Sequence, residues 1–342
     1  MRLLPVLIGG LLVLTGCSGP STEKDTEASA APAPPATTGG SPATGGSPAP
    51  TYSPAVDDPT TQAPITTDAE TPRPQGPVNL LLVGSDSRDP ASVTGNADSI
   101  VLVHLPADRS SLGLVSFSRD MWVSVPGAGE AKINAALPIG GVPLLTETVS
   151  ELLGGLDVDH TVQVSMDALP ELTGWLDGIE VVNQHPSEIV DSAGRRVVFE
   201  QGPIRLEADE VLHYARQRQG MPHGDLDRAE RQRAVLVALM DRLQGRLAED
   251  RAALLEVLPL VRDAVHLDGD TGLEDLLALV PLMVDLDRED TYSLMVPISG
   301  FDTIGGQSVN IVDRGRTAAL GQALREDDLA GYVARHGTSY VP

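Results

Sequence analysis

Arginine is concentrated in one short stretch of this chain, residues 213–232, which read HYARQRQGMPHGDLDRAERQ. Arg216 and Arg218 are two positions apart, so in an extended segment their side chains point to the same side. Guanidinium groups donate paired N–H bonds that match the oxygens of a phosphate group. The stretch therefore predicts a phosphate-binding segment.

The second half of this stretch has the spacing of a helix face. Asp225 follows Gly224 at a position suited to a helix N-cap. Asp225, Arg228 and Gln232 then lie at i, i+3 and i+7, which places them on one side of a helix. Strand end, loop and helix start could together aim several donors at one ligand.

The alternative interpretation is a solvated, salt-bridged helix surface, which is the usual meaning of mixed charges. It explains Glu230, Arg231 and Arg233 well, and we expect Arg233 to lie off the proposed face. It explains Arg216 and Arg218 less well, because they follow the apolar segment VLHYA without alternating acids.

Two aspartates at the ends of predicted strands are candidate metal ligands. Asp86 follows the apolar run 78–83, and Asp98 directly precedes the run 99–105. If these strands are neighbours, both carboxylates lie at the same end of a sheet. Hard oxygen ligands beside a phosphate site suit Mg²⁺. Alternatively, both residues are ordinary turn formers.

Two further cations are candidates for the same site. Arg119 follows an apolar run in SFSRDMWV, where it could bind phosphate, although a surface ion pair with Asp120 is the simpler alternative. Lys132 is one of only two lysines, and the other, Lys24, lies in a segment rich in proline and threonine.

Composition narrows the function classes. The formal net charge is −24, which argues against general nucleic-acid binding, because that function needs a broad basic surface. Aromatic residues make up 3% of the chain, so we expect a core of aliphatic side chains. The seven histidines show no metal-ligand spacing, and we expect His213 and His223 to be bystanders.

The amino-terminal sequence MRLLPVLIGGLLVLTGC resembles the lipobox of bacterial lipoproteins. It predicts a signal peptide over residues 1–16, cleaved before a lipidated Cys17 that holds the protein on the outer face of the cytoplasmic membrane, facing the cell wall. The alternative is an ordinary secretory signal in which Cys17 is incidental. The apolar run is short for a spanning helix, which needs about 20 residues.

Residues 17–76 predict a disordered linker that follows the lipidated cysteine. Pro, Thr, Ser, Ala and Gly dominate this segment, and TGGSPA occurs twice in tandem, at 38–43 and 44–49. Neither Leu nor Phe occurs between residues 18 and 76. Such a segment cannot bury enough apolar surface to offset the entropy of ordering.

From Val78 onwards, strand and helix patterns are interleaved, which predicts one α/β domain over residues 77–342. Strands are expected at 78–83, 99–105, 112–117, 161–166, 179–183, 291–298 and 308–312. Helices are expected at 144–154, 206–215, 225–247, 252–266, 272–286 and 314–326.

Six motifs occur in the order and approximate spacing of the LytR-CpsA-Psr family, namely GSDSR, ADSIVLVHL, SFSRDMWV, KINAA, YARQR and GDLDRAERQ. The chain resembles this family from about Val78 to beyond Leu243. The resemblance implies a catalytic α/β domain with a central mixed β-sheet flanked by helices. It also implies a hydrophobic tunnel for a polyprenyl chain and a pyrophosphate site with Mg²⁺ (or Mn²⁺).

The activity implied by the resemblance is that of a phosphotransferase. It moves an anionic glycopolymer from a polyprenyl-pyrophosphate carrier onto peptidoglycan and releases polyprenyl phosphate. Asp86 and Asp98 would bind the metal, and Asp225 would support the site. Arg119, Asp86 and Arg218 would carry catalysis. The pyrophosphate-binding residues would be Arg88, Arg119, Lys132, Arg216, Arg218, Arg228 and Gln232.

Three departures from the family pattern keep other functions open. Asn96 and Ala97 stand where many members have basic residues, and Ser118 replaces a proline, which we expect only to loosen the loop. A lipobox replaces the usual spanning helix. The alternatives are a non-catalytic lipoprotein that binds polyprenyl-linked glycans or regulates an enzyme, and a lipid pyrophosphate hydrolase that uses water as acceptor. A solute-binding lipoprotein is a weaker third candidate.

Overall fold

The computed structural model describes residues 76–85, 95–267 and 288–338, together with Gly272, Asp275, Leu276, Leu279 and Leu286. All of them belong to one compact unit, Pro72–Pro342. The predicted signal peptide, Cys17 and the linker lie outside the described residues, as do Asp86 and Arg88. Within the described part, no helix combines the length and the apolar character needed to cross a membrane.

A six-stranded mixed sheet forms the centre of this unit, as predicted, in the order β11-β6-β1-β2-β3-β12. The pairs β1–β2, β2–β3 and β6–β11 are antiparallel, whereas β1–β6 and β3–β12 are parallel. The strand bounds are β1 (Val78–Ser85), β2 (Ala97–Leu105), β3 (Leu112–Phe117), β6 (His160–Ser165), β11 (Val265–Leu267) and β12 (Thr291–Met295).

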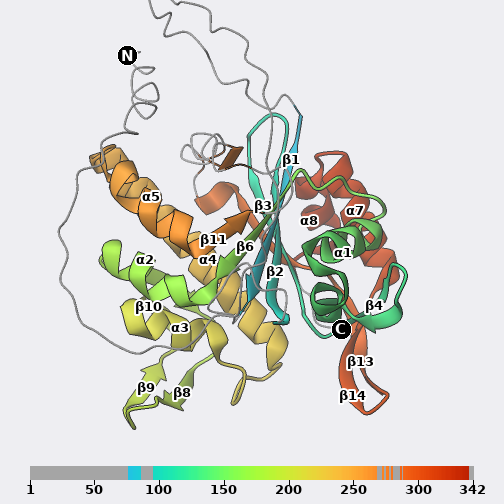
Figure 1. Ribbon diagram of the computed structural model, residues 1–342, viewed down its shortest axis with the longest axis horizontal. Coiled ribbons are helices and arrows are strands. Elements are labelled where there is room, and N and C mark those ends of the chain that lie inside the picture. Colours follow the sequence, from blue (N-terminus) through green and yellow to red (C-terminus); the bar gives the residue numbers. More distant parts are fainter. Residues whose placement is uncertain are drawn as a thin grey trace, which may run out of the picture. The chain divides into compact units, whose positions relative to one another are not determined.

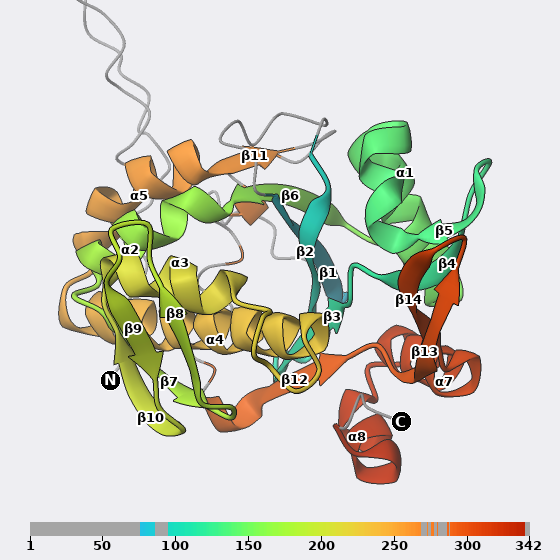
Figure 2. The ribbon, with the colours of Figure 1, turned by 90° about the horizontal axis from the view of Figure 1, so that it is seen from below.

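Helices cover both faces of this sheet, as Figures 1 and 2 show. Their bounds are α1 (Ala136–Leu152), α2 (Leu169–Trp175), α3 (Ala208–Arg216), α4 (Asp225–Glu249), α5 (Ala253–Ala264), α7 (Arg314–Arg325) and α8 (Leu329–His336). Short 3₁₀ turns are η1 (Ile133–Ala135), η2 (Met166–Ala168) and η3 (Arg288–Asp290).

The apolar run of β1 follows from this two-sided burial. Leu81 and Val83 pack in the core that also contains residues of α1, α7 and α8. Leu80 and Leu82 belong to the core on the opposite face, where α4 contributes Leu236. Because both faces are buried, the strand is apolar at four successive positions, 80–83, instead of alternating with polar residues.

A second sheet of four strands has the order β13-β14-β4-β5. Its strands are β4 (Met121–Val125), β5 (Gly129–Lys132), β13 (Ile298–Ile304) and β14 (Gln307–Val312). The turn 118–120 leads directly from β3 of the central sheet into β4. Arg119 therefore lies where the chain crosses between the two sheets.

Two antiparallel pairs complete the strands of the described part, β7 (Ile179–Asn183) with β10 (Gly202–Leu206), and β8 (Ser187–Val190) with β9 (Arg196–Phe199). The strands predicted at 112–117 and 179–183 match β3 and β7. The predicted helix 144–154 is the second part of α1, which is kinked at Gly140 and Gly141. The predicted helix 272–286 falls almost entirely outside the described residues.

The contact between α7 and the end of α1 requires a glycine. A Cβ on the buried Gly321 would lie 2.2 Å from the Leu153 carbonyl oxygen, a backbone atom that cannot move aside cheaply. Gly321→Ala is expected to lower the free energy of unfolding by roughly 1–3 kcal/mol, measured by urea denaturation. Gly315→Ala, at the exposed start of the same helix, is the control and should be neutral or stabilising by up to about 1 kcal/mol. Equal effects of the two substitutions would contradict this packing argument.

Candidate active site

Four charged side chains form a closed ring of alternating sign, which we call the charge quartet: Asp98, Arg119, Asp225 and Arg228. Asp98 contacts Nη1 of Arg119 and lies 3.7 Å from Nη1 of Arg228 through Oδ1. Asp225 Oδ1 lies 2.6 Å from Nη2 of Arg228 and 3.3 Å from Nε of Arg119. Arg228 Nη2 also donates to the Asp98 carbonyl oxygen at 3.0 Å. Each carboxylate thus bridges both guanidinium groups.

The quartet joins segments that are distant in the sequence. Asp98 is the second residue of β2, and Arg119 lies in the turn between β3 and β4. Asp225 and Arg228 occupy the first turn of α4, at the i, i+3 spacing that the sequence predicted. The prediction that Asp225 is the N-cap was wrong by one position. Gly224 is the N-cap, with a positive φ of 57°, so the carboxylate of Asp225 faces the arginines.

Burial and mutual pairing shift the pKa values of Asp225, Arg119 and Arg228. Burial raises the pKa of the Asp225 carboxyl above its usual value, and Arg228 and Arg119 offset this only in part. Burial likewise lowers the pKa of Arg228 against the opposing effect of Asp225. Burial also lowers the pKa of Arg119. The neighbouring aspartates, Asp225 foremost, raise it by more than burial lowers it, so the pKa of Arg119 lies above the usual arginine value. The guanidinium groups remain charged at neutral pH.

The quartet leaves hydrogen-bonding capacity unused. Within the described part of the chain, Nε of Arg119, Nε of Arg228 and Oδ1 of Asp225 are buried and have no hydrogen bond of acceptable geometry. Ion pairs balance the charges of these atoms without satisfying their directional bonds. A buried donor left without a partner costs about 1–3 kcal/mol, so the quartet is held together mainly by charge and not by a complete set of hydrogen bonds.

A cavity of about 480 Å³, the arginine cavity, opens beside the quartet. Its lining residues are Asp98, Arg119, Met166, Asp167, Arg216, Arg218, Arg228 and Gln232. Four arginines and two aspartates make this lining cationic within a chain of net charge −24. The structure therefore brings together six of the predicted site residues, namely Asp98, Arg119, Arg216, Arg218, Arg228 and Gln232.

Two contacts position the far wall of the arginine cavity. Gln232 Nε2 donates to the Ala215 carbonyl oxygen at 3.3 Å, which ties α4 to the last turn of α3. Arg216 Nη2 donates to Asp167 Oδ1 at 2.9 Å. Asp167, in η2 directly after β6, was missed by the sequence analysis. Its signal was a polar residue after a strand, the same signal that singled out Asp86.

The donors at this cavity suit a hard cation. Asp98 presents a partly exposed carboxylate at the cavity, and a carboxylate has two oxygens with about four lone-pair sites, so its contacts with arginine do not exhaust it. Oxygen donors of this type fit Mg²⁺ or Mn²⁺. Of the two predicted metal ligands, Asp98 alone falls within the described residues.

Ser118 has a role that the sequence analysis did not predict. Its buried hydroxyl donates to Asp225 Oδ2 at 3.2 Å and accepts from Nδ2 of Asn310 at 2.7 Å. The chain Asn310–Ser118–Asp225 therefore connects β14 to the quartet. The expectation that serine only loosens this loop was wrong, because proline has no hydroxyl with which to make these bonds.

The interpretation of a mixed-charge surface required Arg231 and Arg233 to be solvated, and the structure contradicts it. Each is only 3% exposed. Arg231 stacks 4.3 Å from the ring centroid of Tyr214 and donates to Gln217, Asn183 and Ser187. Arg233 Nε donates to Ser293 Oγ at 3.0 Å. Both lie off the arginine cavity, and both are buried structural residues.

Lys132 lines a different cavity from Arg216, Arg218 and Arg228. This second cavity, of about 490 Å³, is called the Trp122 cavity and is lined by Asn96, Arg119, Asp120, Trp122, Glu130, Ala131, Lys132, Asn134, Ala135 and Gln307. Lys132 Nζ donates to Asp120 Oδ1 at 2.6 Å. Arg119 lines both cavities, so it separates an arginine-rich pocket from one that offers an indole and amides.

A family model, the LytR_cpsA_psr family, matches residues 51–326, which include every residue of both cavities. The chain belongs to the LytR_cpsA_psr family. Both the mixed central sheet and the resemblance drawn from the six motifs are therefore confirmed. Members of this family provide the comparison for the site.

Two relatives illustrate what is known of the LytR_cpsA_psr family. The probable cell wall biosynthesis protein LcpB of Corynebacterium glutamicum is 35% identical over 263 residues, 72% of this chain and 61% of that protein. The polyisoprenyl-teichoic acid–peptidoglycan teichoic acid transferase TagU of Enterococcus faecalis is 34% identical over 203 residues, 58% of this chain and 63% of that protein. The chain thus spans less than two thirds of the length of these relatives.

A solved structure of the same fold is that of TagT bound to LI-WTA. It has a TM-score of 0.61 and 25% identity, and the match covers 74% of this chain and 91% of that chain.

Ser118→Ala is expected to weaken the site without unfolding the protein. It removes the hydroxyl that positions the Asp225 carboxylate, and one such hydrogen bond contributes about 0.5–1.5 kcal/mol. Binding of inorganic pyrophosphate, measured by calorimetry, should therefore weaken about three- to tenfold. Ser118→Thr, which retains a hydroxyl, should recover most of the loss. Unchanged binding in Ser118→Ala would remove Ser118 from the site.

Proposed function

We propose that the chain is a phosphotransferase that moves an anionic glycopolymer from a polyprenyl-pyrophosphate carrier onto peptidoglycan. The observation that carries the proposal is the arginine cavity, where Arg119, Arg216, Arg218 and Arg228 from three segments line one pocket. Guanidinium groups arranged in this way match the several oxygens of a pyrophosphate. The names of the transferase relatives support the same substrate class.

The transfer requires one bond to form and one to break. A hydroxyl oxygen of the peptidoglycan acceptor attacks the phosphorus next to the glycopolymer. The bond from that phosphorus to the bridging oxygen breaks, and polyprenyl phosphate leaves with the electron pair. The proton of the hydroxyl passes to a carboxylate, for which Asp86 is the candidate from the sequence.

The arginines stabilise the charge that this step redistributes. Arg119 and Arg228 are held by the quartet, so their positive ends are oriented before the substrate arrives. Preorganised donors of this kind cost no reorganisation as charge develops on the phosphate oxygens. Arg216 and Arg218 are exposed at the opposite wall, where they would bind the remaining oxygens.

Asp98, with Asp86, would hold Mg²⁺ or Mn²⁺ beside these arginines. The ion would neutralise charge on the phosphate oxygens during transfer. The neutral Asn96 lines the Trp122 cavity at the position where many family members have a basic residue. One phosphate contact of such members is therefore replaced here by an amide.

The Trp122 cavity favours transfer over hydrolysis to water. It shares Arg119 with the arginine cavity, and it offers an indole ring together with Asn134, Gln307 and Lys132. Aromatic faces and amide groups suit a sugar, whereas a water nucleophile needs no such pocket. We assign the glycan acceptor to this cavity.

The predicted lipid anchor completes the proposal. A lipidated Cys17 followed by a long linker would hold the catalytic unit near a membrane-bound carrier and within reach of peptidoglycan. Met166, the one apolar residue among the described lining residues of the arginine cavity, would contact the first prenyl units.

Alanine substitution of each cavity arginine tests the proposal. Arg119→Ala, Arg216→Ala, Arg218→Ala and Arg228→Ala should each remove a charge-assisted contact of roughly 1.5–3 kcal/mol. Binding of a labelled polyprenyl-pyrophosphate glycan, and its transfer to peptidoglycan in the presence of Mg²⁺, should fall at least about tenfold for each variant.

The control is Arg262→Ala, because Arg262 is 69% exposed in α5 and pairs only with its neighbour Asp263 among its described contacts. Arg233 is unsuitable because it is buried. Thermal unfolding of all five variants separates loss of contact from loss of fold. Losses no larger than that of Arg262→Ala would remove the phosphate site. Binding without transfer in the wild type would instead favour the non-catalytic glycan-binding protein.

Trp122→Ala tests the assignment of the acceptor cavity. Removal of the indole should lower transfer to peptidoglycan by about two- to tenfold, since an aromatic stacking contact contributes roughly 0.5–1.5 kcal/mol. Binding of the lipid pyrophosphate should be unchanged, and Trp122→Phe should restore part of the transfer. If the substitution reduced lipid binding as strongly as transfer, the Trp122 cavity would not be the acceptor site.

A further inference from the structure

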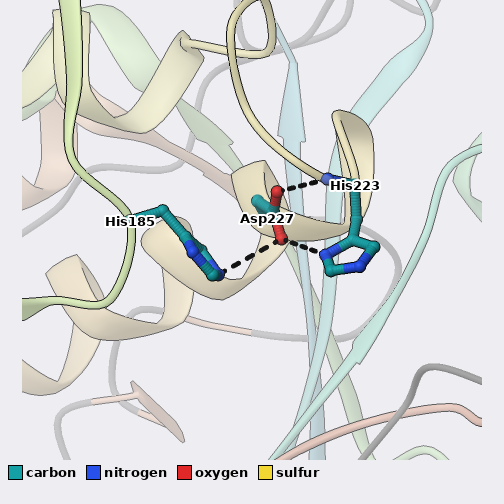
Figure 3. A group of neighbouring side chains, drawn as sticks. All are labelled: His185, His223 and Asp227. Atoms are coloured by element: carbon teal, nitrogen blue, oxygen red, sulfur yellow. Dashed lines mark hydrogen bonds and ion pairs between the residues drawn. The ribbon is translucent and has the colours of Figure 1, made fainter.

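Three side chains with metal-binding atoms converge beside α4, outside both cavities. His185 lies between β7 and β8, His223 lies in the loop before α4, and Asp227 lies in the first turn of α4. One potential ligand atom of each lies within 4.8 Å of the other two. Figure 3 shows the two imidazole rings on either side of the Asp227 carboxylate. We call these three residues the histidine cluster.

The carboxylate of Asp227 is oriented for this role. Its side chain is fully buried, and Oδ2 accepts the backbone N–H of His223 at 2.6 Å. Oδ1 then lies 3.2 Å from Nδ1 of His223 and 3.7 Å from Nε2 of His185. One oxygen is thus fixed by the backbone while the other faces two imidazole nitrogens.

Hydrogen bonds from Arg231 hold the two segments that carry the histidines. Buried Arg231 donates to the His185 carbonyl oxygen at 2.8 Å and to Ser187 Oγ at 2.7 Å. It also donates to Gln217 in the loop that leads to His223. Outer contacts of this kind orient the ligands of metal sites, and here they tie both histidine-bearing segments to the same buried arginine.

The spacing of the ligand atoms is close to that of a transition-metal site. In tetrahedral zinc sites, bonds of about 2.0–2.1 Å place adjacent ligand atoms about 3.3 Å apart. Two of the distances in the cluster, 3.2 and 3.7 Å, are near this value. The side chains of His185 and His223 are 32% and 37% exposed, so their rings are free to rotate. Such rotation can shorten the third distance, the one between the two imidazole nitrogens. Imidazole nitrogens select zinc-like ions over Mg²⁺, which prefers oxygen.

We propose that His185, His223 and Asp227 bind a divalent transition-metal ion of the zinc class. The ion joins the β7–β8 connection, the α3–α4 loop and the start of α4. The α3–α4 loop also carries Arg218, which lines the arginine cavity, and Arg228 follows Asp227 directly. Metal binding therefore restrains the loop that presents Arg218. The metal site itself does not depend on the proposed transferase function.

Zinc titration tests the site. The full chain, freed of metal by a chelator, is titrated calorimetrically with Zn²⁺ in excess Mg²⁺, which occupies oxygen-only sites. We expect one Zn²⁺ per chain, and binding at least about tenfold weaker in His185→Ala and in His223→Ala, since each loses a ligand. His336→Ala removes an exposed histidine from α8 and should bind as the wild type does. Wild-type affinity in both cluster variants, or equal loss in His336→Ala, overturns the site.

Two further readouts separate a built site from hydrogen-bonded surface histidines. The visible absorption of the Co²⁺-loaded protein should show bands of an ordered, low-coordinate site, and these should vanish in both cluster variants. Trypsin cleavage after Arg216 and Arg218 should be slower with Zn²⁺ in the wild type and unchanged by Zn²⁺ in the variants. Zinc binding without the absorption bands overturns the geometry, and unaltered cleavage overturns the restraint of the loop.

Discussion

The charge quartet is the constraint on which the rest of the site depends. A buried charge is tolerated only when an opposite charge or good hydrogen bonds surround it, and removing one member of a buried pair typically costs 3–5 kcal/mol. Asp98, Arg119, Asp225 and Arg228 satisfy one another only if β2, the β3–β4 turn and α4 take one relative arrangement. That arrangement also places the start of α4 beside the end of α3, so the positions of Arg216 and Arg218 follow from it.

The fold and much of the site were predictable because their signals are local. The continuous apolar runs of β1 and β3 mark strands buried on both faces, and the i, i+3 spacing of Asp225 and Arg228 marks one face of α4. The order of the six motifs, through the family resemblance, predicted that residues from separate segments share one site, which no local pattern could have predicted. The short strands β4, β5 and β13 were missed, although β4 pairs with β5 and β13 with β14, their neighbours in the sequence. Strands β5 and β13 lie largely exposed and have no apolar run to mark them.

Arg231 and Arg233 show where local reasoning fails. A helix sequence with mixed charges predicts a solvent-exposed helix. The residues near Arg231 in the sequence do not indicate that Tyr214, Asn183 and Ser187 contact it in the fold. The same limit applied to the histidines, whose spacing in the chain suggested no common site, although folding brings His185 and His223 to one carboxylate. Ser118 was also misjudged, because its partner Asn310 comes from the far end of the sequence.

The cationic lining of the arginine cavity differs in sign from the net charge of the whole chain. A pocket lined by four arginines in a protein of net charge −24 is a local reversal of the field, and low-dielectric walls concentrate such a field on an approaching anion. The acidic surroundings in turn disfavour indiscriminate binding of polyanions elsewhere on the surface. At the proposed phosphate site, selectivity for an anionic ligand would thus arise from the position of the cations and not from their number.

The bridging position of Asp98 has a thermodynamic consequence. Its carboxylate contacts Arg119 and lies 3.7 Å from Nη1 of Arg228, so a cation bound at Asp98, as proposed, would compete with the arginines for the same oxygens. A cation that draws the carboxylate away leaves the two guanidinium groups to an anion, and an anion that engages the guanidinium groups leaves the carboxylate to a cation. Affinities for the two ions are therefore linked, and the linkage is reciprocal by necessity. With the proposed metal and phosphate ligands, the ring of four charges would make the site cooperative between ligands of opposite sign, although no part of the fold would have to change shape.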